Sequence, residues 1–372
     1  MQTPTLTKPH YPILDGLRGV AALMVVTFHL FEAHATSHLT QVINHGYLAV
    51  DFFFVLSGFV IGYAYDDRWL KLTTKEFFIR RLIRLQPMVI MGMVVGAVLF
   101  YFQAYGIFPL IPHVPIWKML LIMLIGCTLL PIPPSMDIRG WQEMHPLDGP
   151  GWSLFFEYIA NILYALVVRY FSKTLLALLV VVSGIFLIHT AVTSPNGDIV
   201  GGWSLDAIQL HIGFARLLYP FFAGLLLNRI VILTKIKHGF LLCSVLIIMV
   251  LAFPRIGGAA HVWMNGLYDS LSIIMILPLI VWLGASGTLS GKHATKLCTF
   301  FGNISYPLYI THYPLIYIYT GWVLQNKLSI SQAWPYAILV LILSVTLSYT
   351  YLKLYDEPIR LWLTKKFLVR GK

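Results

Sequence analysis

The sequence predicts an all-α, polytopic integral membrane protein. Hydrophobic residues make up 58% of its 372 positions and charged residues only 11%, and the mean hydropathy is +0.78. A soluble domain carries about a quarter charged residues. Apolar runs long enough to span a bilayer recur from residue 14 to residue 352. A single integral membrane domain is therefore expected over residues 1–372, with the lipid bilayer as its first partner.

Ten apolar runs are expected to form transmembrane helices, because each approaches the roughly 20 residues that the hydrocarbon core of a bilayer requires. They cover residues 14–32, 46–65, 86–104, 152–168, 174–191, 211–228, 239–253, 264–283, 303–323 and 334–352. A shorter run, 117–131, ends in a proline-rich segment. It is predicted to be a re-entrant or interfacial element in a long external loop, about 105–151.

Basic residues predict the orientation, because cytoplasmic loops of membrane proteins carry an excess of Lys and Arg. Residues 66–85 and the C-terminal tail are both basic and are placed in the cytoplasm, together with both termini. The residues concerned are Arg68, Lys71, Lys75, Arg80, Arg81 and Arg84 in the loop and Arg360, Lys365, Lys366, Arg370 and Lys372 in the tail. The net charge of +11 is interpreted as the same bias, because the basic residues cluster in short loops between apolar runs. A nucleic-acid partner is therefore not expected.

Arg18 and His29 are ionisable residues inside the first apolar run. Eleven positions at about 100° each come to roughly three full turns, so both side chains share one face of the helix. About 16 Å separates them along the helix axis, which is about half the hydrocarbon thickness. Ionisable side chains in a spanning helix are costly to bury and mark functional sites. On the predicted topology Arg18 lies toward the cytoplasm and His29 near the outer end.

His29 is expected at about the same depth as two carboxylates, Glu157 and Asp51. Glu157 lies in the first turns of a run that enters from outside, and Asp51 lies near the outer start of the second run. An imidazole can accept a hydroxyl proton near neutral pH, and a neighbouring carboxylate orients it. His29 is thus a candidate general base with Glu157 as its expected partner. The alternative is a polar residue at the membrane interface.

Arg80, Arg81 and Arg84 precede the third apolar run, with Arg80 and Arg84 one helical turn apart. Guanidinium groups bind phosphates bidentately, so this cluster is a candidate site for a nucleotide-bearing cofactor. A topology anchor or a contact to lipid headgroups is the alternative.

A polar stripe is expected on the helix over 303–323, where Ser305, Tyr309 and His312 follow i, i+4 and i+7 spacing. Hydrogen-bonded packing between helices is the favoured interpretation of this stripe. Arg216 is a further charge inside an apolar run and needs a partner.

Several other residues favour structural roles. The small residues Ser57 and Gly58 allow close helix approach. An interfacial aromatic belt is favoured over sugar stacking for three tryptophans in predicted external positions. These are Trp141, Trp152 and Trp203.

No metal site is expected. Three histidines share the first outer loop, and a solvated loop is favoured there over metal binding. Three cysteines are scattered without the spacing of a metal site or a disulfide framework. These residues are His34, His38 and His45, and Cys127, Cys243 and Cys298.

Taken together, these segments resemble the membrane-bound acyltransferase-3 family, whose members O-acylate surface glycans and some small molecules. The matches follow the order of the family along the whole chain, and as an ordered set they are specific. They are Leu14-Asp15-Gly16-Leu17-Arg18-Gly19 with the Arg-x10-His spacing, Asp51-Phe52-Phe53-Phe54-Val55-Leu56-Ser57-Gly58-Phe59, Arg80-Arg81-x2-Arg84-x2-Pro87, Trp152-Ser153-Leu154-x2-Glu157, Gly302-x2-Ser305-Tyr306-x2-Tyr309-x2-His312 and Glu357-Pro358. Ala49 stands where many members carry glycine. The chain looks like the stand-alone form, without the C-terminal esterase-like domain of some members.

The resemblance implies an O-acyltransferase of a bacterial inner membrane. Such an enzyme takes an acyl group, usually acetyl, from coenzyme A on the cytoplasmic side and passes it to a hydroxyl of an extracytoplasmic or lipid-linked carbohydrate. By resemblance Arg80, Arg81 and Arg84 hold the phosphates of acetyl-CoA, with Arg18 deeper along the path. His29 is then the general base. Direct transfer and an acyl-enzyme intermediate both remain open, and the candidate substrate or relay residues are Asp51, Ser305, Tyr306, Tyr309 and His312.

Two other classes of protein compete with this interpretation. A transporter for a glycan or an anionic substrate would use Arg18, Arg216 and His29 without covalent chemistry. A polymerase or ligase for lipid-linked sugars would also use external His and Arg residues, but that class typically carries a larger external loop. Consumption of acyl-CoA distinguishes the acyltransferase from the transporter.

Overall fold

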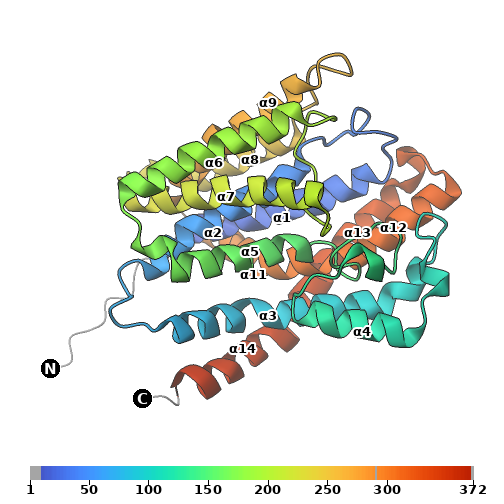
Figure 1. Cartoon of the computed structure of the whole chain (residues 1–372), viewed down its shortest axis with the longest axis horizontal. Helices are drawn as coiled ribbons and strands as arrows, with labels where there is room; N and C mark the ends of the chain where they lie inside the picture. The colour runs from blue at the N-terminus through green and yellow to red at the C-terminus, as the bar shows by residue number, and fades with distance from the viewer. Residues whose placement is uncertain (1–9, 290, 370–372) are drawn as a thin grey trace.

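The computed structural model describes residues 10–289 and 291–369, and most of these are helical (Figure 1). The predictions for residues 1–9 and for Arg370 and Lys372 lie outside these ranges. The α-helices, in chain order, are α1 (Pro12–Glu32), α2 (Ala49–Tyr65), α3 (Thr74–Leu99), α4 (Ile116–Cys127), α5 (Gly151–Leu166), α6 (Lys173–Thr193), α7 (Ala207–Ile230), α8 (Gly239–Ala252), α9 (Trp263–Leu271), α10 (Leu277–Ser286), α11 (Lys292–Thr311), α12 (Tyr313–Asn326), α13 (Ile330–Tyr351) and α14 (Glu357–Thr364).

Short helical turns and one minimal strand pair complete the described chain. The turns are η1 (Gly46–Leu48), η2 (Phe100–Gln103), η3 (Ile111–His113), η4 (Pro134–Met136), η5 (Val168–Tyr170), η6 (Ser272–Ile276), η7 (Leu352–Asp356) and η8 (Lys365–Val369). The π-turns η6 and η7 join α9 to α10 and α13 to α14. Strands β1 (Ile236–Lys237) and β2 (Gly287–Thr288) pair in parallel.

Seven helical segments of the described chain are long and apolar enough to cross a membrane by length and composition. They are Pro12–Glu32, Gly46–Tyr65, Thr74–Gln103, Lys173–Thr193, Ala207–Ile230, Trp263–Ser286 and Ile330–Leu368. The all-α, polytopic prediction is therefore confirmed. The other predicted runs are also helical but shorter or broken, so ten crossings stay a prediction. Helix α4 has 12 residues, or about 18 Å of length, well below the hydrocarbon thickness.

Two helix boundaries differ from the sequence-based expectation. Helix α3 begins at Thr74 because Thr73 and Glu76 form a capping box, so the arginine cluster lies within the helix. The run over 303–323 is not one helix, because the chain bends at His312 between α11 and α12. Pro314 has no backbone N–H to bond the carbonyl of Ile310, which explains the break.

Glycines allow the central helices to pack closely. A Cβ at Gly58 on α2 would lie 2.1 Å from the carbonyl oxygen of Phe221, and one at Gly224 on α7 would lie 2.0 Å from that of Val55. Neither position could accept even alanine without separating the helices. The predicted close packing at Gly58 is thus confirmed.

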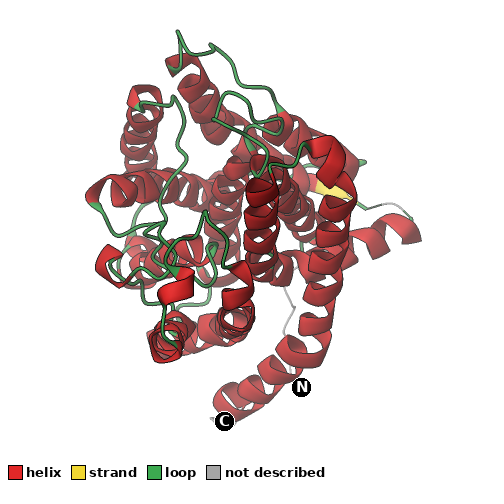
Figure 2. Ribbon diagram, turned by 90° about the vertical axis from the view of Figure 1, so that its right-hand side faces the viewer, coloured by secondary structure: helices red, strands yellow, loops and turns green. Residues whose placement is uncertain are grey.

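The two ends of the bundle differ in character. The basic loop before α3 and helix α14 lie together at the left of Figure 1. Long loops gather at the opposite end, which faces the viewer in Figure 2. The segments placed in the cytoplasm by their charge thus share one end of the molecule, as the predicted topology requires.

Candidate active site

A cavity of about 530 Å³ opens among α1, α3, α5, α11 and the segment η7–α14. We call it the arginine cavity, because four guanidinium groups line it together with Glu157. The residues that matter here are Arg18, Arg81, Arg84, Glu157, Arg360, Ser305, Tyr306 and Tyr309. Arg84 also lines a neighbouring open hollow with Arg80 and Arg360. The arginines that the sequence singled out therefore do gather around shared space.

Among the described residues, three of the four arginines that line the cavity are paired, and Arg84 is free, as is Arg80 in the neighbouring hollow; Arg360 pairs with Asp356 at 3.2 Å. Arg81 binds Glu157 at 2.6 Å, and Arg18 binds Asp15 at 2.8 Å. Arg80 and Arg84 make no ion pair or side-chain hydrogen bond with any other described residue, and both are exposed. A guanidinium without an internal partner keeps all its N–H donors for an anionic ligand.

A second cavity, of about 560 Å³, lies at the end where the long loops gather. We call it the His29 cavity. Its polar lining includes His29, Glu32, Glu143 and Arg216, and its aromatic lining includes Trp141, Trp152, Trp203, Tyr309, Tyr313 and Tyr317. The three tryptophans therefore line a cavity, and the belt that the sequence favoured for them is wrong.

His29 has a carboxylate partner, but it is Glu32 rather than Glu157. Nδ1 of His29 lies 2.6 Å from Oε2 of Glu32, one turn further along α1. Glu157 instead accepts hydrogen bonds from Arg81 and, at 3.1 Å, from Oγ of Ser57. The expected pairing was wrong because Glu157 lines the arginine cavity, whereas His29 lines the other cavity.

Two further rings surround His29. The imidazole of His312 stacks on it with ring centroids 5.8 Å apart, and the ring of Tyr313 meets it edge-on at 4.8 Å. His312 is fully buried; its Nδ1 faces the carbonyl oxygens of Leu308 and Tyr309, and its Nε2 has no partner among the described residues. The helix break at His312 thus brings a second imidazole beside the candidate base.

Tyr309 stands between the two cavities, because it lines both of them, as does Val50. Its hydroxyl lies 2.7 Å from Oγ of Ser153 on α5. The two cavities are therefore neighbours, and Tyr309 lies in the wall between them.

Ser305 and Tyr306 line only the arginine cavity, and their hydroxyls are already engaged. Oγ of Ser305 donates to the carbonyl of Gly302 at 2.8 Å, and the Tyr306 hydroxyl donates to that of Leu85 at 2.6 Å. Neither contacts His29, so an acyl relay through them stays a prediction that these bonds do not favour.

Asp51 and Arg216 are partners in an ion pair. They form a buried ion pair of 2.8 Å on the wall of the His29 cavity, and Arg216 also donates to the carbonyls of Tyr47 and Gly201. Asp51 lies at the depth expected, but its partner is Arg216 and not His29. Its position indicates that it holds a wall of the cavity.

Three residues of the His29 cavity were missed from the sequence: Glu32, Glu143 and Tyr317. The i, i+3 spacing of His29 and Glu32 on one helix would have revealed the first. Glu143 accepts a 2.7 Å hydrogen bond from Tyr317, whose ring is covered by the guanidinium of Arg139. These partners come from distant parts of the chain, so no local pattern indicates them.

Glu143 makes the stability of the fold depend on pH. Burial raises the pKa of its carboxyl to about 7, while the charge of Arg139 opposes the shift. Because the folded state holds this proton more tightly than the unfolded state, stability falls as pH rises from the ordinary carboxyl pKa through about 7. We expect Glu143→Gln to flatten this dependence in thermal unfolding measured from about pH 5 to about pH 8. Parallel curves for the two proteins would contradict it.

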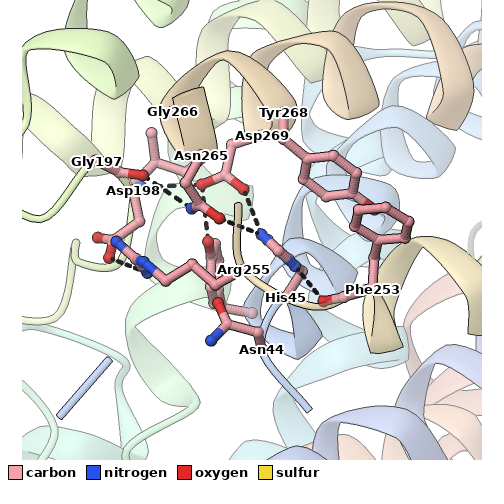
Figure 3. Close-up of polar contacts among 12 residues, drawn as sticks. Asn44, His45, Gly197, Asp198, Phe253, Arg255, Asn265, Gly266, Tyr268 and Asp269 are labelled. Carbon is pink, nitrogen blue, oxygen red and sulfur yellow. Dashed lines mark hydrogen bonds and ion pairs between the residues drawn. The ribbon is translucent and has the colours of Figure 1, made fainter. Parts of the chain in front are cut away.

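The outer-loop histidines all make polar contacts, but only one of them is buried. His45 is fully buried and bonded to Asn265 and to the carbonyl of Phe253 (Figure 3). His38 binds Asp198 at 2.8 Å, and His34 contacts the Tyr319 hydroxyl. Among the described residues no group of three or more His, Cys, Asp or Glu is placed to hold a metal ion. The solvated-loop expectation is therefore wrong for His45, whereas the His38 side chain is 46% exposed and His34 is partly exposed.

The helical bundle, with two polar cavities that share Val50 and Tyr309 in their linings, is that of an integral membrane protein. Membrane transferases and transporters both have such cavities. The chain belongs to the acyltransferase-3 family, whose acyltransferase domain matches residues 11–353.

Individual relatives agree with this family. O-acetyltransferase OatA of Staphylococcus aureus is 25% identical over 379 aligned positions, covering 95% of this chain and 58% of that protein. Peptidoglycan O-acetyltransferase OatA of Listeria monocytogenes is 36% identical over 97 residues, 25% of this chain and 14% of that protein. Protein 2 in the picA locus of Rhizobium radiobacter is 33% identical over 162 residues, 41% of this chain and 80% of that protein. The chain thus spans little more than half of the S. aureus relative, and no solved structure matches it.

Proposed function

We propose that this protein is a membrane O-acetyltransferase that moves an acetyl group from cytoplasmic acetyl-CoA to a hydroxyl of an extracytoplasmic or lipid-linked carbohydrate. The observation that carries the proposal is the meeting of two cavities at Tyr309, one lined by arginines and the other containing a carboxylate-bound histidine. Each cavity has the chemistry that one of the two substrates needs.

The arginine cavity suits the donor. Coenzyme A carries phosphate groups at one end, and two free guanidinium groups are available to bind them: Arg84 lines this cavity, and Arg80 lines the open hollow beside it. Arg81 is held by Glu157, and Arg18 on α1 lines the same cavity. Because the basic loop before α3 belongs to this end, the donor side is the cytoplasmic side of a bacterial inner membrane. Both termini are then cytoplasmic as well.

The His29 cavity suits the chemical step. Glu32 accepts a hydrogen bond from Nδ1 of His29, which leaves Nε2 to take the proton of the acceptor hydroxyl. The hydroxyl oxygen then forms a bond to the thioester carbonyl carbon, the carbon–sulfur bond breaks, and the thiol leaves with a proton. For this the thioester must reach past Tyr309 from the arginine cavity. Direct transfer requires no acyl-enzyme intermediate.

The lining of the His29 cavity favours a carbohydrate acceptor. Trp141, Trp152 and Trp203 offer aromatic faces for sugar rings, and Glu32 and Glu143 offer acceptors for hydroxyls. The names of two relatives, O-acetyltransferase and peptidoglycan O-acetyltransferase, are consistent with such an acceptor.

Two measurements test the proposal. The first compares surface glycans and glycolipids by mass spectrometry in wild-type cells, a deletion strain, and the deletion rescued with His29→Ala. The second follows acetyl-CoA consumption by purified protein in lipid nanodiscs. Loss of one acetyl substituent in the deletion and in the failed rescue is the expected result. An unchanged glycan profile together with no consumption of acetyl-CoA would favour the transporter.

Arg84→Ala is expected to weaken the use of acetyl-CoA. Loss of a charge-assisted phosphate contact costs about 2–3 kcal/mol, or roughly 30- to 150-fold in kcat/KM for acetyl-CoA. Arg68→Ala is the matched control, because Arg68 is an exposed arginine of the basic loop that lines neither cavity. Equal kinetics for the two variants would leave Arg84 as a topology anchor only.

A further inference from the structure

A third, smaller cavity lies beside the His29 cavity. Its volume is about 260 Å³, and its lining includes five residues of the His29 cavity: Phe28, Glu32, Ala35, Tyr47 and Val200. We call it the Arg255 cavity. Its other lining residues are all polar: Thr36, Ser37, His38, Gln41, Asn44 and Arg255.

Hydrogen bonds hold the residues of the polar wall of the Arg255 cavity in place. Asp198, which is buried, accepts hydrogen bonds from His38 at 2.8 Å and from Arg255 at 3.2 Å. Arg255 also donates to the carbonyl of Asn196. The amide nitrogen of Asn44 donates to the carbonyl of His38 at 2.8 Å. Figure 3 shows Asn44, Asp198 and Arg255 grouped beside the buried His45 network. These contacts fix the wall in one arrangement.

Three polar atoms of this wall have no hydrogen-bond partner among the described residues. They are Oδ1 of Asn44, Nε2 of Gln41 and Nε of Arg255. Asn44 is only 3% exposed and the Arg255 side chain only 5%. A buried polar atom that stays unbonded destabilises the fold, so such a group indicates a missing partner.

The three atoms together offer the hydrogen-bond donors and acceptor that the hydroxyl groups of a ligand require. Asn44 offers an acceptor, and Gln41 and Arg255 offer donors, whereas a hydroxyl both donates and accepts. The charge of Arg255 is already paired with Asp198. A neutral, hydroxyl-rich ligand therefore fits this wall better than an anion.

We propose that the Arg255 cavity is a second acceptor subsite, which binds the sugar ring next to the ring that is acetylated. This inference rests on the proposed function. Glu32 lines both cavities and orients His29, so a ring held against Asn44 and Arg255 places its neighbour at the base. The acceptor is then a neutral glycan of at least two rings, and a free monosaccharide is a poor substrate.

The test uses the full chain in lipid nanodiscs with acetyl-CoA. The acceptors are size fractions of the source cell's surface glycan after partial hydrolysis, down to single rings. We expect wild-type kcat/KM to be about tenfold higher or more for the two-ring fraction than for the single-ring fraction, the size of one to two hydrogen bonds. Gln41→Met and Asn44→Leu should lose most of this preference. Acetyl transfer to single-ring acceptors, and hydrolysis of acetyl-CoA by water, should be unchanged in both variants.

Gln41→Met is the cleaner variant, because the amide nitrogen that it removes has no internal partner. Asn326→Leu is the matched control for Asn44→Leu, since the exposed Asn326 amide also donates to a backbone carbonyl, that of Trp322, and lines none of the three cavities. Equal use of single-ring and two-ring acceptors, or an unchanged preference in both variants, overturns the subsite. If no fraction is acetylated and no acetyl-CoA is consumed, the proposed function itself fails.

Discussion

His29→Ala is expected to abolish acetyl transfer while the protein stays folded and inserted in the membrane. A positioned general base contributes about 10²–10⁴-fold to rate, and the loss should fall on kcat rather than on KM for acetyl-CoA, because His29 lines the cavity remote from the arginines. The measurement is acetyl-CoA-dependent acetylation of the surface glycan by the purified variant in nanodiscs.

His113→Ala is the matched control, since His113 is exposed and lines neither cavity. Glu32→Gln is expected to give a smaller loss, because it keeps a hydrogen-bond acceptor but removes the charge that stabilises a protonated His29. Wild-type turnover in His29→Ala would remove His29 from the mechanism, and a loss as large in His113→Ala would assign the effect to folding.

Arg216→Met is expected to have the largest effect on stability. It leaves Asp51, which is fully buried, without its ion-pair partner, and breaking a buried pair costs about 3–5 kcal/mol. It also leaves the carbonyls of Tyr47 and Gly201 without their donor. Thermal unfolding of the purified protein, followed by tryptophan fluorescence, measures the loss.

Two further proteins make this result specific. Arg229→Met breaks a partly exposed pair with Asp66 at 2.7 Å and is expected to cost much less. The double variant Asp51→Asn with Arg216→Met should recover part of the loss, because no unpaired charge then remains buried. Equal losses in Arg216→Met and Arg229→Met would mean that burial of the pair does not matter.

The class of fold followed from local composition. Long apolar runs in a bilayer can satisfy their backbone groups only as helices, so the positions of most helices could be predicted from hydropathy alone. The exceptions have local causes. The capping box at Thr73 and Glu76 starts α3 early, and Pro314 breaks the predicted helix at His312.

The candidate site was predictable only where it is local to one helix. Arg18 and His29 were predicted to share a face of α1 at a known axial separation, and in the structure they line two different cavities. Arg80 and Arg84 were placed together for the same reason. The i, i+3 pair of His29 and Glu32 could have been predicted from the sequence in the same way.

Partners between helices depended on the tertiary structure alone. Depth in the membrane suggested Glu157 for His29, but in the folded bundle Glu157 contacts Arg81 in the arginine cavity, and Asp51 pairs with Arg216. The stacking of His312 on His29, the contact of Glu143 with Tyr317 and the cavity at Arg255 also join segments far apart in the chain. The sequence by itself determined which segments cross an apolar medium and which charges lie at each end, because both depend on local composition. Side-chain partners depend on how helices rotate and pack against one another, and only the assembled bundle decides that.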